Sequence, residues 1–312
     1  MRNRPRSPGF LCTLAALATV ALVGCSGGGG PVGPDPAPAV AAESTAEIRG
    51  RVVDQISGAP IAGVRVSAGG TSTSTDAEGR FVLHAGGTHV SLSGTGYYDR
   101  VASLASPAGS YTLVPRTFDM TAFNDVARDH STGTLRWLAA PAVYVDVRAH
   151  AFATGGEVPA EWVEQAAALA PRFVSQWTGG ALSARSVTVG ATPPAPGTPG
   201  TLVILFDEDP ARYPSASSAG TATPAYGGDG VIESATVRLR FSRLTGPAAA
   251  ISRQAVLGHE LGHALGLAHM DGATASMMAG IVRTPELTAF DRAAGALLYS
   301  RLPDTRADDR ES

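Results

Sequence analysis

The sequence contains no lysine, so all 24 of its basic residues are arginine. This absence excludes a lysine nucleophile and Schiff-base chemistry anywhere in the chain. Charged residues make up only 16% of the 312 residues, and the formal net charge is -3. A nucleic-acid-binding protein needs a basic face, so this charge balance argues against a nucleic-acid partner. The hydrophobic fraction of 44% is sufficient for globular domains, and the length allows two of them.

Cysteine is nearly absent, and both cysteines, Cys12 and Cys25, lie at the N-terminal end. The first residues there are rich in arginine, and the apolar run Leu11–Val23 follows them. This layout is typical of an export signal, because the run is too short to span a bilayer comfortably. Cys12 leaves with such a signal, so the mature chain cannot form an intrachain disulfide although it is exported.

The end of this segment, Leu22-Val23-Gly24-Cys25, resembles a bacterial lipobox. The resemblance implies a signal peptide over residues 1–24 and a lipidated Cys25 that anchors the protein to a membrane of the bacterial cell envelope. Ser26 then favours the outer membrane in a diderm, with the protein facing the periplasm or the cell surface. The alternative is an ordinary secretory signal that is cut elsewhere, with Cys25 incidental. Residues 25–45 are rich in Gly, Pro and Ala without apolar periodicity, which predicts a flexible tether.

Short strands separated by frequent turns are predicted for residues 46–116. Candidate strands such as residues 48–53, 64–66 and 80–83 recur with Gly and Asp turns between them, which favours a small β-sandwich. The run from Gly50 to Asp99 resembles the carboxypeptidase regulatory-like, or transthyretin-like, domain. The resemblance implies a module without catalytic residues of its own. It serves either as a binding or spacer module or as a positioning aid for the next domain.

Residues 117–303 have a different pattern of apolar residues, which predicts strands mixed with about three helices and an α+β fold overall. Helices are expected over residues 159–177, 247–267 and 284–300, where apolar residues recur at intervals of three and four. Strands are expected over residues 137–147, 186–189, 201–206 and 232–241, with a long Gly/Ser/Ala-rich loop over residues 211–230. Residues 304–312 are predicted to form a polar C-terminal tail.

The chemistry of the chain is concentrated in residues 256–269, VLGHELGHALGLAH, where three of the seven histidines occur. His259 and His263 are four residues apart, so one face of a helix presents both to the same metal ion. His269 is ten residues beyond His259, which in a continuous helix is about 15 Å of rise and too far for that ion. The helix must therefore end, and Gly266 is expected at the turn that brings His269 back.

Three neutral imidazoles on zinc leave a fourth position for water, which is the pattern of catalytic rather than structural sites. Glu260 follows the first predicted ligand, and its carboxylate can reach that water as a general base. The pattern His259-Glu260-x-x-His263-x-x-Gly266-x-x-His269 is therefore predicted to be a zinc-dependent hydrolytic site.

This pattern resembles the long zinc-binding signature of the metzincin metallopeptidases, and its amino-acid sequence is most similar to that of the matrixin branch. The resemblance implies a metzincin catalytic domain with a mixed twisted sheet, acting on a protein or peptide substrate. It implies a Met-turn formed by Met278 or by Met277, with the Ser-x-Met wording slightly favouring Met278. The C-terminal run that contains Leu287, Asp291 and Tyr299 resembles the last helix of the family.

Two departures from the family limit what the resemblance implies. Ala279 and Gly280 stand where a tyrosine or proline usually follows the Met-turn, so a tyrosine ligand there is not supported. No cysteine is available for latency by a cysteine switch.

The segment from Thr236 to Phe241 is expected to be the edge strand that aligns substrate, although an ordinary inner strand is the alternative.

The acidic groups at residues 207–209 and at Asp229 could contribute to Ca²⁺ binding, as in some relatives. Solvated loop carboxylates are the alternative interpretation of these groups. Neither the oligomeric state nor the substrate follows from the sequence.

The sequence therefore predicts a membrane-anchored zinc endopeptidase in which Glu260 acts as general base. The alternative is a non-enzymatic surface lipoprotein in which the sandwich binds a partner and the zinc is structural. Against this alternative stands Glu260, which has no task in a zinc site that only stabilises the fold.

Overall fold

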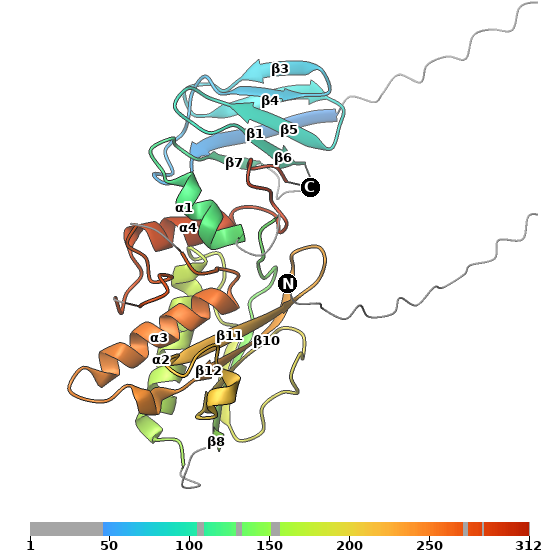
Figure 1. The fold of residues 1–312 in the computed structure, drawn as a ribbon. Coiled ribbons are helices and arrows are strands. Elements are labelled where there is room, and N and C mark those ends of the chain that lie inside the picture. Colours follow the sequence, from blue (N-terminus) through green and yellow to red (C-terminus); the bar gives the residue numbers. More distant parts are fainter. Residues whose placement is uncertain are drawn as a thin grey trace, which may run out of the picture. The chain divides into compact units, whose positions relative to one another are not determined.

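The computed structural model describes residues 46–104, 109–128, 133–150, 157–270, 274–282 and 284–311. These residues contain two hydrophobic cores. The first lies in an N-terminal region of strands, and the second lies in a region that combines a sheet with helices (Figure 1). The predicted α+β class, with an N-terminal sandwich followed by a mixed region, is confirmed at this level. The predicted signal, Cys25 and the tether lie outside the described residues.

The N-terminal region is a β-sandwich in its described residues. One sheet has the order β4-β1-β7 and the other the order β3-β2-β5-β6. Alternate residues are buried along β4, which places Phe81 and Leu83 in the core between the sheets. The strands are β1 Ala46–Asp54, β2 Arg65–Ala68, β3 Thr71–Ser74, β4 Arg80–Ala85, β5 His89–Ser93, β6 Arg100–Ser103 and β7 Ser110–Leu113.

The second region is built on a five-stranded sheet of order β11-β12-β10-β8-β9. Neighbouring strands from β12 to β9 run parallel, whereas β11 at the edge runs antiparallel to β12. Strand β10 is buried along nearly its whole length, as expected for the centre of such a sheet. The strands are β8 Ala142–His150, β9 Ser186–Gly190, β10 Thr201–Asp207, β11 Gly220–Tyr226 and β12 Ile232–Leu239.

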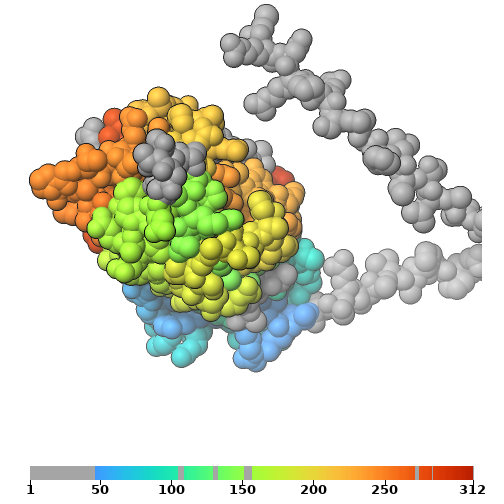
Figure 2. All heavy atoms as spheres, turned by 90° about the horizontal axis from the view of Figure 1, so that it is seen from below, coloured from blue at the N-terminus to red at the C-terminus, as the bar shows by residue number. Residues whose placement is uncertain are grey.

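Helices accompany this sheet. Helix α2 contacts β8 and β9, and α3 contacts β11 and β12, so the two helices lie beside each other against the sheet. In Figure 2, residues coloured green through orange, which belong to this second region, form most of the face in view. The helices are α1 Met120–Arg128, α2 Ala160–Trp177, α3 Ala249–Ala264 and α4 Ala289–Tyr299, with 3₁₀ turns at η1 Pro210–Arg212 and η2 Phe241–Arg243. Helix α1 was not predicted. In the described part of the chain, no helix has the length and apolar character needed to cross a membrane.

The structure corrects the predicted edge strand. The segment from Thr236 to Phe241 falls largely in β12, which lies between β11 and β10 and is therefore an inner strand. The edge is β11, within residues 211–230 that were predicted as a loop. The sequence of β11, GTATPAY, lacks alternating large apolar residues, and none of its side chains is fully buried, so the alternation that predicts a strand is missing. Its pairing with β12 makes it a strand nonetheless.

The polar C-terminal segment is not a solvated tail in its described residues. Arg301 donates two hydrogen bonds to Asp309, of 2.6 and 2.8 Å, and both side chains are almost fully buried. Arg301 also donates to Thr112 Oγ1 at 2.6 Å, and Arg100 is paired with the buried Glu311 at 2.6 Å. Thr112 and Arg100 belong to the sandwich, so this charge network links its residues to the end of the chain. Polar composition predicted exposure here, whereas pairing of opposite charges permits burial.

We expect Asp309→Asn to destabilise the protein by about 3 kcal/mol, because it leaves the buried Arg301 without its charge partner. Burial opposes ionisation of Asp309, but the positive charge and hydrogen bonds of Arg301 outweigh it and hold the pKa of Asp309 below its ordinary value. The contribution is therefore present above about pH 4 and is lost as the pH falls below that value. Urea unfolding at pH 7 and pH 3 measures both effects. Asp308→Asn is the matched control, since the Asp308 side chain is 65% exposed, and a loss equal to that of Asp309→Asn would contradict the account.

Candidate metal centre and active site

Helix α3 ends where His269 must turn back toward His259 and His263. The Gly266 N–H bonds to the His263 carbonyl at 3.1 Å and the Leu267 N–H bonds to the Gly262 carbonyl at 3.0 Å, which is the Schellman arrangement of a helix end. Gly266 has φ of 100°, and a Cβ there would overlap the carbonyl of Leu135. Both facts require glycine at this position, which is where the sequence predicted the turn.

The returning chain is held on both sides of His269. The Ala268 N–H donates to the Val126 carbonyl in α1 at 2.7 Å, and the Met270 N–H donates to the Met278 carbonyl at 2.9 Å. These bonds place the His269 ring so that its Nε2 lies 3.2 Å from His259 Nε2. The unpredicted α1 therefore contributes directly to the position of the third histidine.

The backbone fixes the proton on two of the imidazole rings. His259 Nδ1 lies 2.7 Å from the Met277 carbonyl, and His263 Nδ1 lies 2.7 Å from the Leu267 carbonyl. A carbonyl oxygen can only accept, so each Nδ1 donates and carries the proton of its neutral ring. Burial lowers the pKa of His259 to about 4, which keeps that ring neutral. The two Nε2 atoms, 3.1 Å apart, then present lone pairs to each other rather than a hydrogen bond.

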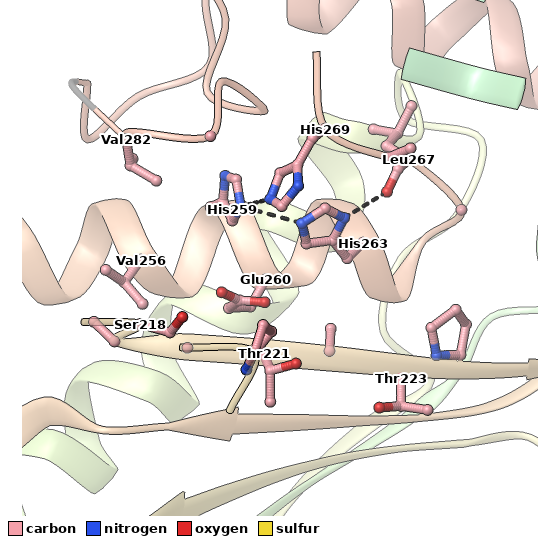
Figure 3. Close-up of a pocket in the computed structure, with 18 of the residues that line it drawn as sticks. Ser218, Thr221, Thr223, Val256, His259, Glu260, His263, Leu267, His269 and Val282 are labelled. Carbon is pink, nitrogen blue, oxygen red and sulfur yellow. Dashed lines mark hydrogen bonds between the residues drawn. The ribbon is translucent and has the colours of Figure 1, made fainter. Parts of the chain in front are cut away.

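This geometry fits a zinc ion. Tetrahedral Zn–N bonds of about 2.0–2.1 Å place two nitrogen ligands about 3.3 Å apart, close to the 3.1 and 3.2 Å separations of the Nε2 atoms. Among the described residues, His259, His263 and His269 form the one group of three or more His, Cys, Asp or Glu side chains that could hold a metal. Figure 3 shows the three rings pointing toward one another. The donor set of nitrogen atoms is one that zinc accepts, although the arrangement alone does not identify the metal.

Glu260 belongs to α3, and its side chain lies between this helix and β11 (Figure 3). Its side chain is almost fully buried, and its Oε2 has no hydrogen-bond partner among the described residues. Burial raises the pKa of Glu260 to about 8. A Cβ at Gly220 of β11 would overlap the Glu260 carboxylate, so only glycine leaves room for it. Sequence reasoning missed Gly220, because its role depends on the strand position that the loop prediction obscured.

The three histidines and Glu260 line one open pocket of about 810 Å³. Strand β11 forms one wall of it, and the chain after the methionine pair contributes Ile281 and Val282 to the lining. Ile281 is 71% exposed, which is unusual for a large apolar side chain and adds an apolar surface to the pocket. The pocket therefore combines the histidine cluster, one carboxylate and apolar contact area.

Both candidate Met-turn residues lie against α3. A Cβ at Gly258 would overlap the sulfur of Met277, and a Cβ at Gly262 would overlap the sulfur of Met278. Two glycines inside a helix cost about 1 kcal/mol each, and here they allow the methionines to approach closely. The Met277 carbonyl orients His259, whereas the Met278 carbonyl holds the chain beside His269, so each methionine supports a different histidine.

Asp291 of α4 connects this methionine segment to the helix that follows. Its buried carboxylate accepts hydrogen bonds from the Ser276 hydroxyl, from the Met277 N–H at 2.9 Å and from the Thr288 N–H at 2.8 Å. Thr288 and Asp291 also form a capping box at the start of α4. One carboxylate therefore fixes both the helix start and the carbonyl that orients His259.

Aromatic donors hold α3 from the core side. Trp177 Nε1 donates to the Gly258 carbonyl at 2.8 Å, and Trp137 Nε1 donates to the Ala264 carbonyl at 2.9 Å. The Tyr299 hydroxyl donates to the Leu265 carbonyl at 3.0 Å, and burial raises the pKa of Tyr299 above its ordinary value. The helix that carries two of the histidines is thus bound to α2, to α4 and to the segment that contains Trp137, which restricts how its histidines can move.

The acidic groups considered for calcium have other contacts. Asp207 faces Arg238 at 3.8 Å, and Glu208 bonds to Ser242 and lies 3.5 Å from Arg240. Asp209 caps η1, and Asp229 accepts from the Val231 N–H. No three of these carboxylates converge as ligands in the described part of the chain. Their contacts favour the solvated or ion-paired interpretation.

Comparison with known families identifies the first domain. Residues 47–121 match the carboxypeptidase regulatory-like domain, as the sequence predicted for residues 46–116. The match ends inside α1, so it covers the sandwich and stops before the histidine site. No curated protein matches the chain.

We expect Asp291→Ala to weaken zinc affinity by about 10- to 100-fold, because the Met277 carbonyl loses the support that orients His259. Competition with a chelator, together with circular dichroism to check the fold, measures this. Thr288→Ala is the control: it removes the cap of α4 but leaves the bond between Asp291 and Met277. Equal zinc affinity in wild type and Asp291→Ala would contradict this role.

Proposed function

We propose that the chain is a zinc-dependent endopeptidase whose metzincin-type, matrixin-like catalytic domain spans residues 117–303. The observation that carries the proposal is the convergence of three imidazole nitrogens beside Glu260 in an open pocket. A zinc site that only stabilised the fold would not need a buried carboxylate with an unpaired oxygen next to its ligands.

A zinc ion held by His259, His263 and His269 would supply a Lewis acid that polarises the scissile carbonyl and makes water more acidic. The charge of such an ion would favour the ionised form of Glu260 and so offset the effect of burial on its pKa. In that form Glu260 accepts a proton from the attacking water and delivers it to the nitrogen of the departing amine. Gly220 leaves space for the carboxylate in the position from which it reaches the pocket. The histidine side chains keep their orientation because the carbonyls of Met277 and Leu267 hold Nδ1.

The free edge of β11 supports a polypeptide substrate. All residues of this strand except Ala225 line the pocket, and among the described strands it pairs with β12 alone. An extended peptide can pair with the open side and so cross the pocket beside Glu260. We therefore assign the alignment of substrate to β11 instead of to the segment Thr236–Phe241, for which the sequence predicted it.

The proposed location of the protein rests on the N-terminal sequence alone. We propose that Cys25 is lipidated and that residues 26–45 tether the enzyme to a membrane of the cell envelope, the outer membrane in a diderm. The regulatory-like domain then stands between tether and catalytic domain as a spacer or binding module.

The proposal is tested with Glu260→Gln. We expect this variant to keep one zinc per chain and to lose about 10²- to 10⁴-fold in kcat on a peptide library, because the general base is removed. Zinc is counted by mass spectrometry on the purified protein, and cleavage is measured with and without a chelator. Glu286→Gln is the matched control, because Glu286 is half-exposed and pairs with Arg172.

Activity of Glu260→Gln within tenfold of wild type would contradict the assigned role. If wild type and variant both bind zinc and no peptide is cleaved, the non-enzymatic binding lipoprotein becomes the better account. If neither binds zinc, the histidine site itself is wrong.

A second test uses Gly220→Ala. The added Cβ displaces the Glu260 carboxylate, and a misplacement of about 1 Å is expected to lower kcat about 100-fold. Zinc content should not change, since the histidines are untouched. Gly228→Ala is the control, because a Cβ at Gly228 meets no atom within 4 Å. Equal kcat in the two variants would show that β11 does not constrain Glu260.

A further inference from the structure

The pairing of β11 with β12 defines which backbone groups of β11 point away from the sheet. Gly220 lies opposite Leu239, and the Arg240 N–H bonds to the Ala219 carbonyl at 2.8 Å. Ala219 and Arg240 are the next pair of opposite residues, and this bond makes them a hydrogen-bonded pair. Hydrogen-bonded and non-hydrogen-bonded pairs alternate along an antiparallel ladder, so Gly220 and Leu239 form a non-hydrogen-bonded pair. Gly220 therefore turns its N–H and C=O outward, away from β12.

The same alternation continues along the strand. Thr221 and Thr223 face Arg238 and Thr236 as hydrogen-bonded pairs, so their backbone groups point to β12. Ala222 and Pro224 share the orientation of Gly220 and turn their backbone groups toward the free edge. This edge thus offers the carbonyls of Gly220, Ala222 and Pro224 as acceptors.

The donors of the edge are fewer than its acceptors. Gly220 and Ala222 each present an N–H, whereas Pro224 has none. Gly220 lies against the Glu260 carboxylate, and Pro224 lies four residues farther, about 13 Å along the strand. The backbone N–H groups that β11 offers to a substrate therefore begin at Gly220, beside Glu260, and end before Pro224.

We propose that Pro224 sets the length over which β11 pairs with its substrate. This inference rests on the proposed endopeptidase function and specifies its substrate as a short extended stretch. In an antiparallel pairing, the substrate residue opposite Gly220 donates its N–H to the Gly220 carbonyl and accepts the Gly220 N–H at its own carbonyl. The substrate residue opposite Ala222 makes the same two bonds with Ala222. The substrate residue that faces Pro224 donates its N–H to the Pro224 carbonyl, while its own C=O stays with water. The substrate chain is free to bend there, which suits a cleavable loop of a folded protein.

Peptide binding to zinc-loaded Glu260→Gln tests this without requiring turnover. A library screen selects a short peptide that occupies the pocket, and two longer peptides extend it by four residues at either end. We expect the further change Pro224→Ala to tighten binding of one longer peptide about fivefold, the effect of one added hydrogen bond. Binding of the short peptide should stay unchanged. Gly228→Ala is the control, since Gly228 does not line the pocket and a Cβ there meets no atom within 4 Å.

Amide exchange measured by NMR gives a direct second readout. On peptide binding, the amides of Gly220 and Ala222 should become protected. The amide that Pro224→Ala introduces at position 224 should become protected only with the longer peptide. Equal affinity of Pro224→Ala and its parent for all three peptides would overturn the inference, as would an introduced amide that stays unprotected or a pocket that binds no peptide. Cleavage by the wild-type enzyme is scored separately, so peptide binding without cleavage refutes the peptidase function and not the pairing.

Discussion

Two backbone carbonyls determine where the protons of His259 and His263 reside, and the site depends on this constraint. Each carbonyl can only accept, so Nδ1 must donate and Nε2 must present a lone pair. Lone pairs 3.1 Å apart repel unless a cation lies between them. The folded chain therefore holds an arrangement that is unfavourable without a metal ion and favourable with one.

Much of the second region maintains that arrangement. Trp177, Trp137 and Tyr299 bind carbonyls of α3 and its end, while Asp291 fixes the segment whose carbonyl orients His259. Helix α1 and Met278 hold the chain on either side of His269. On the opposite side of α3, β11 leaves room for Glu260 only because residue 220 is glycine. Elements far apart in the sequence thus contribute to one pocket.

The histidine cluster and the turn at Gly266 could be predicted because their constraints are local. Helical spacing brings His259 and His263 together, and the return of His269 demands a helix end between them. The β-sandwich was predictable for a similar reason, since alternation and turn residues recur along one stretch. The role of β11 could not be read this way, because its small residues become a strand only through pairing with β12. The buried C-terminal segment was missed because the charges that permit its burial come from distant residues such as Arg100.

We propose that three imidazoles of this chain hold one zinc ion. X-ray absorption at the zinc edge, on protein loaded with one equivalent of zinc, tests this site most directly. We expect three imidazole nitrogens at about 2.0–2.1 Å and no sulfur neighbour. Fewer than three imidazoles around the zinc, a sulfur ligand, or zinc that is lost on dialysis would contradict the claim.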